Sequence, residues 1–244
     1  AMSLNNEGNI LAVGDDSGYY CSGVLVQKRI VLTAGHCADR RVPTRVFFGP
    51  NAPIGQPRPG EEIRVRAVRH PEYDPRTLAN DITVLILARE PKEVQPRPVA
   101  PVSAIAANAK VVVVGFGEGG EFDELNGVWD TEYGTRQYAA VPVAGMCMSR
   151  TQRCHPGTEM FTSSRRYSKD TCFGDSGGPA YIFPGGDISL APQPVAITSR
   201  AQHGQSAREC GDGQVAVLIE PHLNFIRDVA GTLWSDADNA AGGD

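Results

Sequence analysis

The stretch Asp170-Thr-Cys-Phe-Gly-Asp-Ser-Gly-Gly-Pro179 carries the strongest signal in this chain of 244 residues. Its serine, Ser176, has glycines at 174, 177 and 178. Because glycine has no Cβ, such a segment can turn sharply and bring backbone N–H groups close to a bound group. A hydroxyl nucleophile needs such donors, since its attack creates a negative oxygen. Taken by itself, however, the segment is more typical of a glycine-rich turn.

Two upstream segments change this interpretation. His36 lies in Thr33-Ala-Gly-His-Cys37 after an apolar run, and Asp81 begins the apolar run that ends at Leu87. A hydroxyl nucleophile needs a base to take its proton, and the base needs an acceptor that holds its tautomer. A lone histidine is more often a packed or surface residue, and a lone aspartate a turn former. Together, His36, Asp81 and Ser176 predict a Ser-His-Asp catalytic triad.

These segments resemble those of trypsin/chymotrypsin-type serine proteases. The resemblance runs from about residue 10 to residue 234 and is carried by Cys21-Ser-Gly-Val-Leu-Val26, Thr33–Cys37, His70-Pro-Glu-Tyr-Asp74 with Asn80-Asp81-Ile82, Val114-Gly-Phe-Gly117, Asp170–Pro179 and Pro221-His-Leu-Asn-Phe-Ile-Arg-Asp228. It implies a serine endopeptidase that forms an acyl-enzyme. The alternatives are a protease fold that only binds a partner and a latent precursor with a collapsed pocket.

Short strand-like runs separated by glycine and proline predict an all-β sandwich or barrel. These runs are Ile10–Val13, Val24–Val26, Ile30–Leu32, Arg45–Phe48, Ile63–Val68, Ile82–Leu87, Lys110–Val114, Tyr138–Val143, Ala180–Phe183, Val195–Ser199 and Gln214–Ile219. The resemblance makes this two six-stranded antiparallel β-barrels with a C-terminal helix, which we expect near Pro221–Leu233, with proline at its start.

We expect the first barrel, with His36 and Asp81, in residues 1–100, and the second, with Ser176 and the closing helix, in residues 101–234. The proline-rich stretch Pro91–Pro101 is typical of an extended crossover between the halves. The tail, residues 235–244, contains Asp, Asn, Ala and Gly and is predicted to be disordered.

The composition of the chain indicates which classes of partner it is expected to bind. The formal net charge is −5, which does not support binding to nucleic acid or to an anionic membrane. No apolar run approaches the roughly 20 residues of a membrane span. The polar start of the chain does not resemble a signal peptide, and Ala1-Met2 is typical of a cloning scar. We expect a monomer that acts on protein or peptide substrates without a cofactor.

The chain has six cysteines. The resemblance pairs Cys21 with Cys37 and Cys172 with Cys210. In the family, the usual partner of Cys147 would fall near Thr162, which is not a cysteine. A Cys147–Cys154 disulfide that closes a short loop is therefore a guess. Three bridges imply an oxidising compartment, extracellular or periplasmic; six reduced thiols in a cytosolic enzyme are the alternative. Cysteine and histidine spacings do not suggest a metal site.

The resemblance also assigns the substrate-binding residues. The backbone N–H groups of Gly174 and Ser176 would form the oxyanion hole. Ser199 would support Asp81 and begin the edge strand that pairs with the substrate backbone, although a plain strand serine is equally compatible. Asp170 would lie at the base of the specificity pocket and select Arg or Lys before the cut, unless it is a surface loop residue.

Two residues differ from those that are usual in the family's specificity pocket. Ala201 replaces a glycine that is usual in the pocket wall. An alignment without a gap places Gln214 at a second wall glycine, whereas a gap of one residue would restore Gly213. A side chain of Gln214 that points inward would narrow the pocket or bind the substrate cation.

The usual activation motif is absent, so the resemblance is to bacterial-style members without the zymogen N-terminus. In activated relatives a new N-terminus pairs with the aspartate before the nucleophile, here Asp175. Because an unpaired buried carboxylate is costly, we expect another partner for Asp175. Glu61-Glu62 falls where some relatives bind calcium, but such acidic pairs are mostly solvated surface.

Overall fold

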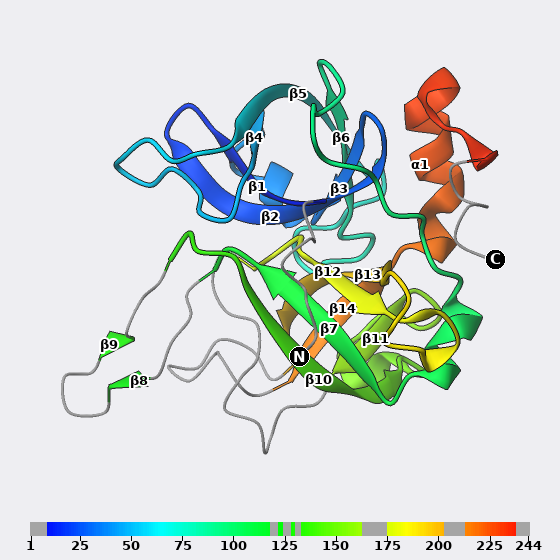
Figure 1. The fold of residues 1–244 in the computed structure, drawn as a ribbon. Helices are drawn as coiled ribbons and strands as arrows, with labels where there is room; N and C mark the ends of the chain where they lie inside the picture. The colour runs from blue at the N-terminus through cyan, green and yellow to red at the C-terminus, as the bar shows by residue number, and fades with distance from the viewer. Residues whose placement is uncertain are drawn as a thin grey trace.

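The computed structural model describes residues 9–117, 133–162, 175–202 and 213–237, together with the backbone of 122–123 and 128–129. Two closed β-barrels, one above the other in Figure 1, form the body of the molecule. The strands in both barrels pair antiparallel. The predicted fold class is therefore confirmed.

The first barrel closes in the order β1-β2-β3-β6-β5-β4. Its strands are β1 (Ile10–Asp15), β2 (Gly18–Gln27), β3 (Ile30–Thr33), β4 (Arg45–Phe48), β5 (Glu61–Arg69) and β6 (Thr83–Leu87). Aliphatic, mostly β-branched side chains of β1, β2, β3 and β6 fill the interior, as suits a pleated buried surface.

The second barrel closes in the order β10-β11-β14-β13-β12-β7. Its strands are β7 (Lys110–Gly115), β10 (Gln137–Met146), β11 (Glu159–Thr162), β12 (Pro179–Ile182), β13 (Gln193–Ala201) and β14 (Gln214–Leu218). A separate two-stranded sheet pairs β8 (Phe122–Asp123) with β9 (Val128–Trp129).

Strand β11 is the barrel strand that sequence analysis missed. It has only four residues and begins with a glutamate, although all four are buried. A buried carboxylate has to be paired, and the partner of Glu159 lies far away in the sequence, in β13. Hydrophobic periodicity therefore could not reveal this strand.

The crossover between the barrels is extended, as predicted for Pro91–Pro101. The Arg97 N–H donates to the Leu25 carbonyl of the first barrel at 3.2 Å, and the Ala100 N–H donates to the Pro194 carbonyl of the second at 2.9 Å. The crossover ends in a 3-10 helix, η3 (Val102–Ala107). Further 3-10 turns are η2 (His36–Ala38), η4 (Arg150–Gln152), η5 (Pro184–Gly186), η6 (Glu220–His222) and η7 (Gly231–Leu233).

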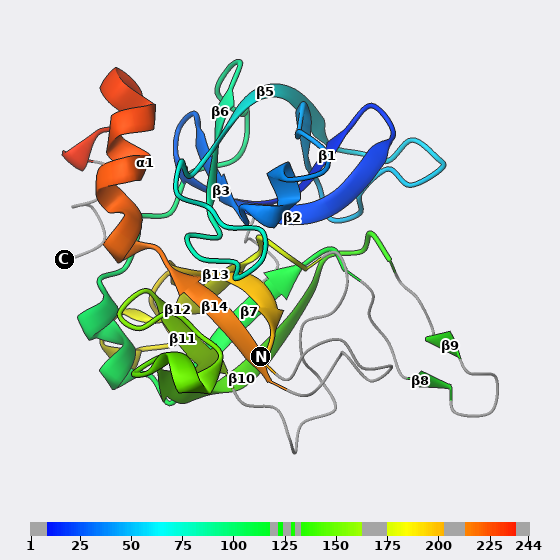
Figure 2. The same ribbon diagram turned by 180° about the vertical axis from the view of Figure 1, so that it is seen from behind.

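The closing helix returns to the first barrel. The segment consists of η6, the α-helix α1 (Leu223–Ala230) and η7, so its predicted range is right but only its middle is α-helical. Ile226 and Ala230 join the apolar cluster of the first barrel, and Figure 2 shows α1 beside that barrel from behind. Gly231, with φ of 54°, ends the helix in a conformation that favours glycine.

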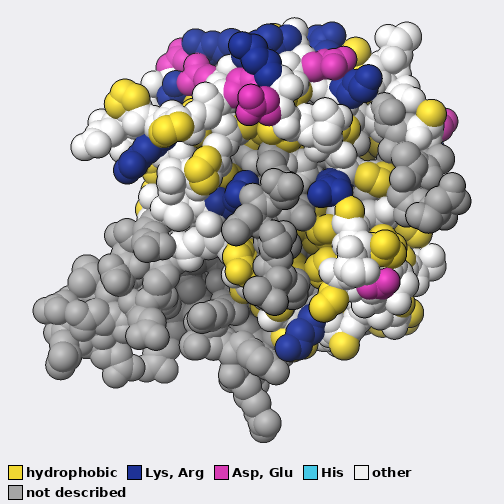
Figure 3. Space-filling model, in the orientation of Figure 1, with side chains coloured by type: hydrophobic (Ala, Val, Ile, Leu, Met, Phe, Trp, Pro, Cys, Tyr) yellow, Lys and Arg dark blue, Asp and Glu magenta, His cyan; other side chains and the backbone are white. Residues whose placement is uncertain are grey.

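Charges of both signs are intermixed on the upper face in Figure 3. The two acids considered for calcium lie in ion pairs of the first barrel: Glu61 with Arg89, and Glu62 with Arg45. Their carboxylates are therefore already engaged with cations.

The predicted disordered tail begins at Ser235, whose N–H and carbonyl both bond with the Gln27 side chain at 3.1 Å. Residues 238–244 lie outside the described residues. In the part of the chain that the structure describes, no helix has the length and apolarity needed to cross a membrane.

Ser22 joins the two barrels. Its N–H donates to the Ser176 carbonyl at 2.9 Å, and its carbonyl accepts the Thr33 hydroxyl at 2.8 Å. Its hydroxyl accepts the Phe116 N–H at 3.0 Å. Ser22 is fully buried, so water cannot replace these bonds.

We expect Ser22→Ala to lower the free energy of unfolding by about 1–3 kcal/mol, because the Phe116 N–H would be left buried without its acceptor. Urea unfolding measures the loss. The exposed Ser103 provides the matched control, Ser103→Ala, which should change stability by less than about 0.5 kcal/mol. Equal effects of the two substitutions would contradict this role of Ser22.

Candidate active site

Asp81 is the buried centre of the candidate site. It lies just before β6, follows Asn80 with its positive φ of 51°, and has no exposed surface. One carboxylate oxygen, Oδ1, accepts the backbone N–H of His36 at 2.7 Å. The other, Oδ2, lies 2.9 Å from His36 Nδ1 and accepts the Ser199 hydroxyl at 2.6 Å. The carboxylate thus receives donors from both barrels.

His36 follows β3 and opens the η2 turn. Because Asp81 accepts at Nδ1, that nitrogen carries the proton and Nε2 is left as the basic nitrogen of the neutral ring. A Cβ on the neighbouring Gly35 would lie 2.8 Å from the Tyr73 ring and 3.0 Å from Asp81 Oδ1, so this close approach requires glycine. The histidine side chain remains 28% exposed, which leaves it accessible to a reacting group.

Ser199 is the second side-chain donor to Asp81. It lies in β13, where the register with β14 shifts between Thr198 and Arg200. Such a bulge re-aims a side chain, and here the Ser199 hydroxyl bonds to Asp81 of the first barrel. Of the two interpretations left open by the sequence, the contact supports the one in which Ser199 assists Asp81.

Ser176 is held at the junction of the barrels by its backbone. Its carbonyl accepts the Ser22 N–H at 2.9 Å and lies 3.7 Å from Cys37 Sγ, one residue beyond His36. The next N–H, of Gly177, donates to the Thr198 carbonyl at 2.9 Å. Gly177 has a φ of 84° and no room for a Cβ, which would lie 2.1 Å from Thr33 Oγ1.

The structure thus brings His36, Asp81 and Ser199 together through side-chain bonds and positions Ser176 nearby through its backbone. Between the described side chains of His36 and Ser176 there is no hydrogen bond. In active sites such bonds can be long and tighten only when substrate binds.

Asp175 has a backbone partner. Its side chain is almost fully buried, and Oδ1 accepts the Gly117 N–H at 2.9 Å. Gly115 makes the approach possible, since a Cβ there would lie 2.1 Å from the same oxygen. The expected partner of this carboxylate therefore includes the amide of Gly117, in the Val114-Gly-Phe-Gly117 motif.

The His36 and Asp81 charges support each other. Burial disfavours the charged imidazole, but the charge and hydrogen bond of Asp81 outweigh burial and raise the pKa of His36 above its ordinary value. Burial likewise opposes ionisation of Asp81, yet His36 and the donors around the carboxylate lower its pKa. The arrangement therefore favours an ionised Asp81 beside a histidine that readily takes up a proton.

The predicted specificity residues are only partly described. Asp170 and Gly174 lie outside the described residues, as do Cys172 and Cys210. Gln214 is buried and pairs across the sheet with Thr162 and Ala201.

Strand periodicity decides which way Gln214 faces. Because side chains alternate along a strand, it shares a face with Ala216 and Leu218, which lie in the core cluster of the second barrel. Gly213, with φ of 85°, precedes β14.

Two disulfides are present in the described residues. Cys21–Cys37 joins β2 to the turn after His36, and an imidazole nitrogen of His36 lies within 4.8 Å of both sulfurs. Cys147–Cys154 closes the short loop that the sequence left as a guess.

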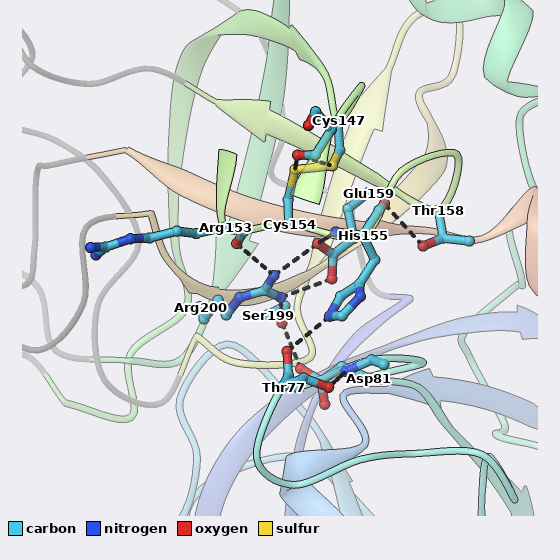
Figure 4. Close-up of polar contacts among 12 residues, drawn as sticks. Thr77, Asp81, Cys147, Arg153, Cys154, His155, Thr158, Glu159, Ser199 and Arg200 are labelled. Carbon is cyan, nitrogen blue, oxygen red and sulfur yellow. Dashed lines mark hydrogen bonds and ion pairs between the residues drawn. A yellow bond between two sulfur atoms is a disulfide. The ribbon is translucent and has the colours of Figure 1, made fainter. Parts of the chain in front are cut away.

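Two charged residues beside the site, Arg200 and Glu159, were not predicted from the sequence. Figure 4 shows them joined next to Ser199 and Asp81. Nη1 and Nη2 of Arg200 each donate to one Glu159 oxygen, both at 2.8 Å. The available signal was one charge in each of two otherwise uncharged strands, Glu159-Met-Phe-Thr162 and Pro194-Val-Ala-Ile-Thr-Ser-Arg200.

Comparisons with known proteins agree with this geometry. The Trypsin family model matches residues 3–209. Mouse (Mus musculus) cathepsin G is 31% identical over 65% of this chain and 60% of its own length. Human (Homo sapiens) serine protease 1 is 30% identical over 67% of the chain and 66% of its own length, and rat (Rattus norvegicus) trypsin-4 is 29% identical over 69% and 67%.

The family model covers most of the chain, and the fold has the two barrels that the family resemblance implied. The chain therefore belongs to the trypsin family. The match spans slightly under two thirds of the length of the first of these relatives.

We expect an NMR titration to give His36 a pKa above the ordinary value, about 6.5. In Asp81→Asn the same resonance should titrate at lower pH, because the charge that stabilises the imidazolium is gone. Asp39 also raises the pKa of His36, but less, so Asp39→Asn is the matched control and should shift it less. A His36 titration unchanged in Asp81→Asn would contradict the coupling.

Proposed function

We propose that this protein is a secreted serine endopeptidase that cleaves protein or peptide substrates after Arg or Lys through an acyl-enzyme. The proposal rests on the buried Asp81 carboxylate, which holds His36 by Nδ1, while the Ser176 carbonyl lies 3.7 Å from the sulfur of the next residue, Cys37. Family membership supports the same reaction. A purely structural aspartate would not need a partly exposed histidine as its partner.

In the first step, Ser176 Oγ attacks the substrate carbonyl while His36 Nε2 takes the hydroxyl proton. The C–O bond forms, the carbonyl electron pair moves to oxygen, and Asp81 stabilises the imidazolium. Collapse of this intermediate breaks the C–N bond, and His36 returns the proton to the leaving amine. The acyl group is then an ester of Ser176.

In the second step, water attacks the ester as His36 removes its proton. The same proton then goes back to Ser176 Oγ as the acid product leaves. The oxyanion of both steps would accept from the backbone N–H groups of Gly174 and Ser176. Loss of one such donor typically costs about 10²–10³ in turnover.

The proposed preference for Arg or Lys rests on Asp170, six positions before the nucleophile. A carboxylate in a desolvated pocket would pair with the substrate cation. A Gln214 side chain that enters this pocket would narrow it or bind the substrate cation, and Ala201 replaces a glycine that is usual in the pocket wall. The relatives named above include both a cathepsin G and a trypsin, and at identities of 29–31% they leave the preference to experiment.

An extracellular or periplasmic location is part of the proposal. Disulfides persist in oxidising compartments, and the described residues contain two. The Cys172–Cys210 bridge that the resemblance implies would add a third beside Ser176. Protein substrates of such an enzyme would be met outside the cytosol.

An organophosphonate that reacts only with activated serine should label Ser176 stoichiometrically, and mass spectrometry of the peptide locates the adduct. Ser176→Ala should abolish both labelling and amide hydrolysis while unfolding at the same temperature, since a hydroxyl at the junction adds little to the core. Ser189, exposed on the second barrel, provides the control Ser189→Ala, which should remain fully active. If the wild-type protein gave neither adduct nor hydrolysis, the result would instead favour a binding module or a latent precursor.

An arginyl amide substrate should be hydrolysed about 10²-fold or more faster than its phenylalanyl counterpart, measured as kcat/KM, because a buried carboxylate left without a cation is penalised. Asp170→Ser should remove most of this ratio. The exposed Asp187 gives the matched control Asp187→Ser, which should leave it unchanged. Equal or reversed rates in the wild type would exclude the assignment of Asp170.

A further inference from the structure

The pair formed by Arg200 and Glu159 is a buried ion pair next to the triad. The Glu159 side chain is 1% exposed and that of Arg200 18% exposed. The two bonds are parallel, each guanidinium nitrogen meeting one carboxylate oxygen, which is the strong geometry for this pair. Because buried ion pairs seldom stabilise a fold more than apolar residues would, a role in specifying a geometry is the more economical explanation.

The pair also fixes the disulfide loop between β10 and β11. Arg200 Nη2 donates to the Arg153 carbonyl at 3.2 Å, and Glu159 Oε2 accepts the His155 N–H at 2.7 Å. His155 Nε2 in turn lies 2.9 Å from the Thr77 carbonyl, in the loop before Asp81. In Figure 4 these contacts surround the Arg200 guanidinium.

The remaining contact of Arg200 reaches Ser199. Nη1 donates to Ser199 Oγ at 3.2 Å. A serine hydroxyl has one proton, and a guanidinium can only donate. Because Ser199 Oγ accepts from Arg200, its own proton is directed to Asp81, 2.6 Å away. Without Arg200, the hydroxyl could rotate to other acceptors.

We propose that Arg200, held by Glu159, is a positioning residue that fixes the Ser199 hydroxyl as a donor to Asp81 and so sets the strength of the His36–Asp81 pair. This rests on the proposed triad. Arg200 touches none of the reacting groups and acts through Ser199. Glu159 orients the guanidinium and balances its charge.

Apart from its contact with Ser199, Arg200 also acts on His36 through its charge. The groups that act on it are Asp81 before β6, Asp39 after η2 and Arg200 of β13, while the Tyr73 hydroxyl interacts with both aspartates. Asp81 and Asp39 favour the imidazolium, and Arg200 disfavours it. Glu159 pairs with Arg200 at 2.8 Å, so removing Glu159 alone would leave this cation uncompensated.

A double-mutant cycle tests the route through Ser199. Arg200→Met alone would leave the buried Glu159 without its partner. Both charges are therefore removed together, as Arg200→Met with Glu159→Gln. This double variant is made once with Ser199 intact and once with Ser199→Ala. We expect the pair change to lower kcat about 3- to 10-fold with little change in KM when Ser199 is present, and less than twofold when it is replaced. The same loss in both backgrounds, or a loss confined to KM, would overturn the proposal.

The titration of His36, followed by NMR, gives a readout that needs no activity. Glu159→Gln should shift the His36 titration to lower pH, because Arg200 keeps its charge without its partner. The combined Arg200→Met, Glu159→Gln variant lacks this cation, so its His36 should titrate at higher pH than in Glu159→Gln. No shift in Glu159→Gln would contradict the electrostatic part of the role.

Exposed ion pairs provide the control. Arg64 and Asp16 are 60% and 78% exposed in the first barrel, so Arg64→Met with Asp16→Asn should change neither kcat nor the His36 titration. Urea unfolding of each variant separates lost stability from lost positioning. If the wild type is inactive, the proposed function fails while the titration still tests this inference.

Discussion

The buried carboxylate of Asp81 is the constraint on which the candidate site depends. An ionised group without contact to water is tolerated only when donors surround it. Here the donors are two N–H groups of His36 and the hydroxyl of Ser199, which come from different barrels. The two barrels therefore have to be docked before the Asp81 charge has all its donors. The need of Asp81 for these donors orients His36 and also fixes how the two barrels meet.

Around this carboxylate, backbone contacts position Ser176. Ser22 forms hydrogen bonds with Ser176, Phe116 and Thr33. The Asp175 side chain accepts a hydrogen bond from the Gly117 N–H. Glycines at 35, 115 and 177 leave room for these approaches, since a Cβ at any of them would collide with a neighbour. The sequence motifs that contain these glycines thus serve the packing of the site as well as its chemistry.

The sequence predicted the barrels well because their strands are apolar runs with clear breaks, as in Ile30–Leu32 and Lys110–Val114. It failed at β11, whose buried Glu159 depends on Arg200, 41 positions further along the chain. It likewise predicted His36 and Asp81 from local motifs and Ser199 from the family resemblance, but it did not indicate Arg200. A pairing between distant charges has no local signature, and neither does the bulge that aims Ser199 across the junction.

A crystal structure of the protein inhibited by an organophosphonate would show whether His36, Asp81 and Ser176 act together on a bound group. We expect phosphorus bonded to Ser176 Oγ, His36 Nε2 within about 2.6–3.2 Å of an oxygen on the adduct, and Asp81 still bonded to Nδ1 and to Ser199. An adduct on another residue, or an imidazole turned away from Ser176 with its bond to Asp81 broken, would contradict it.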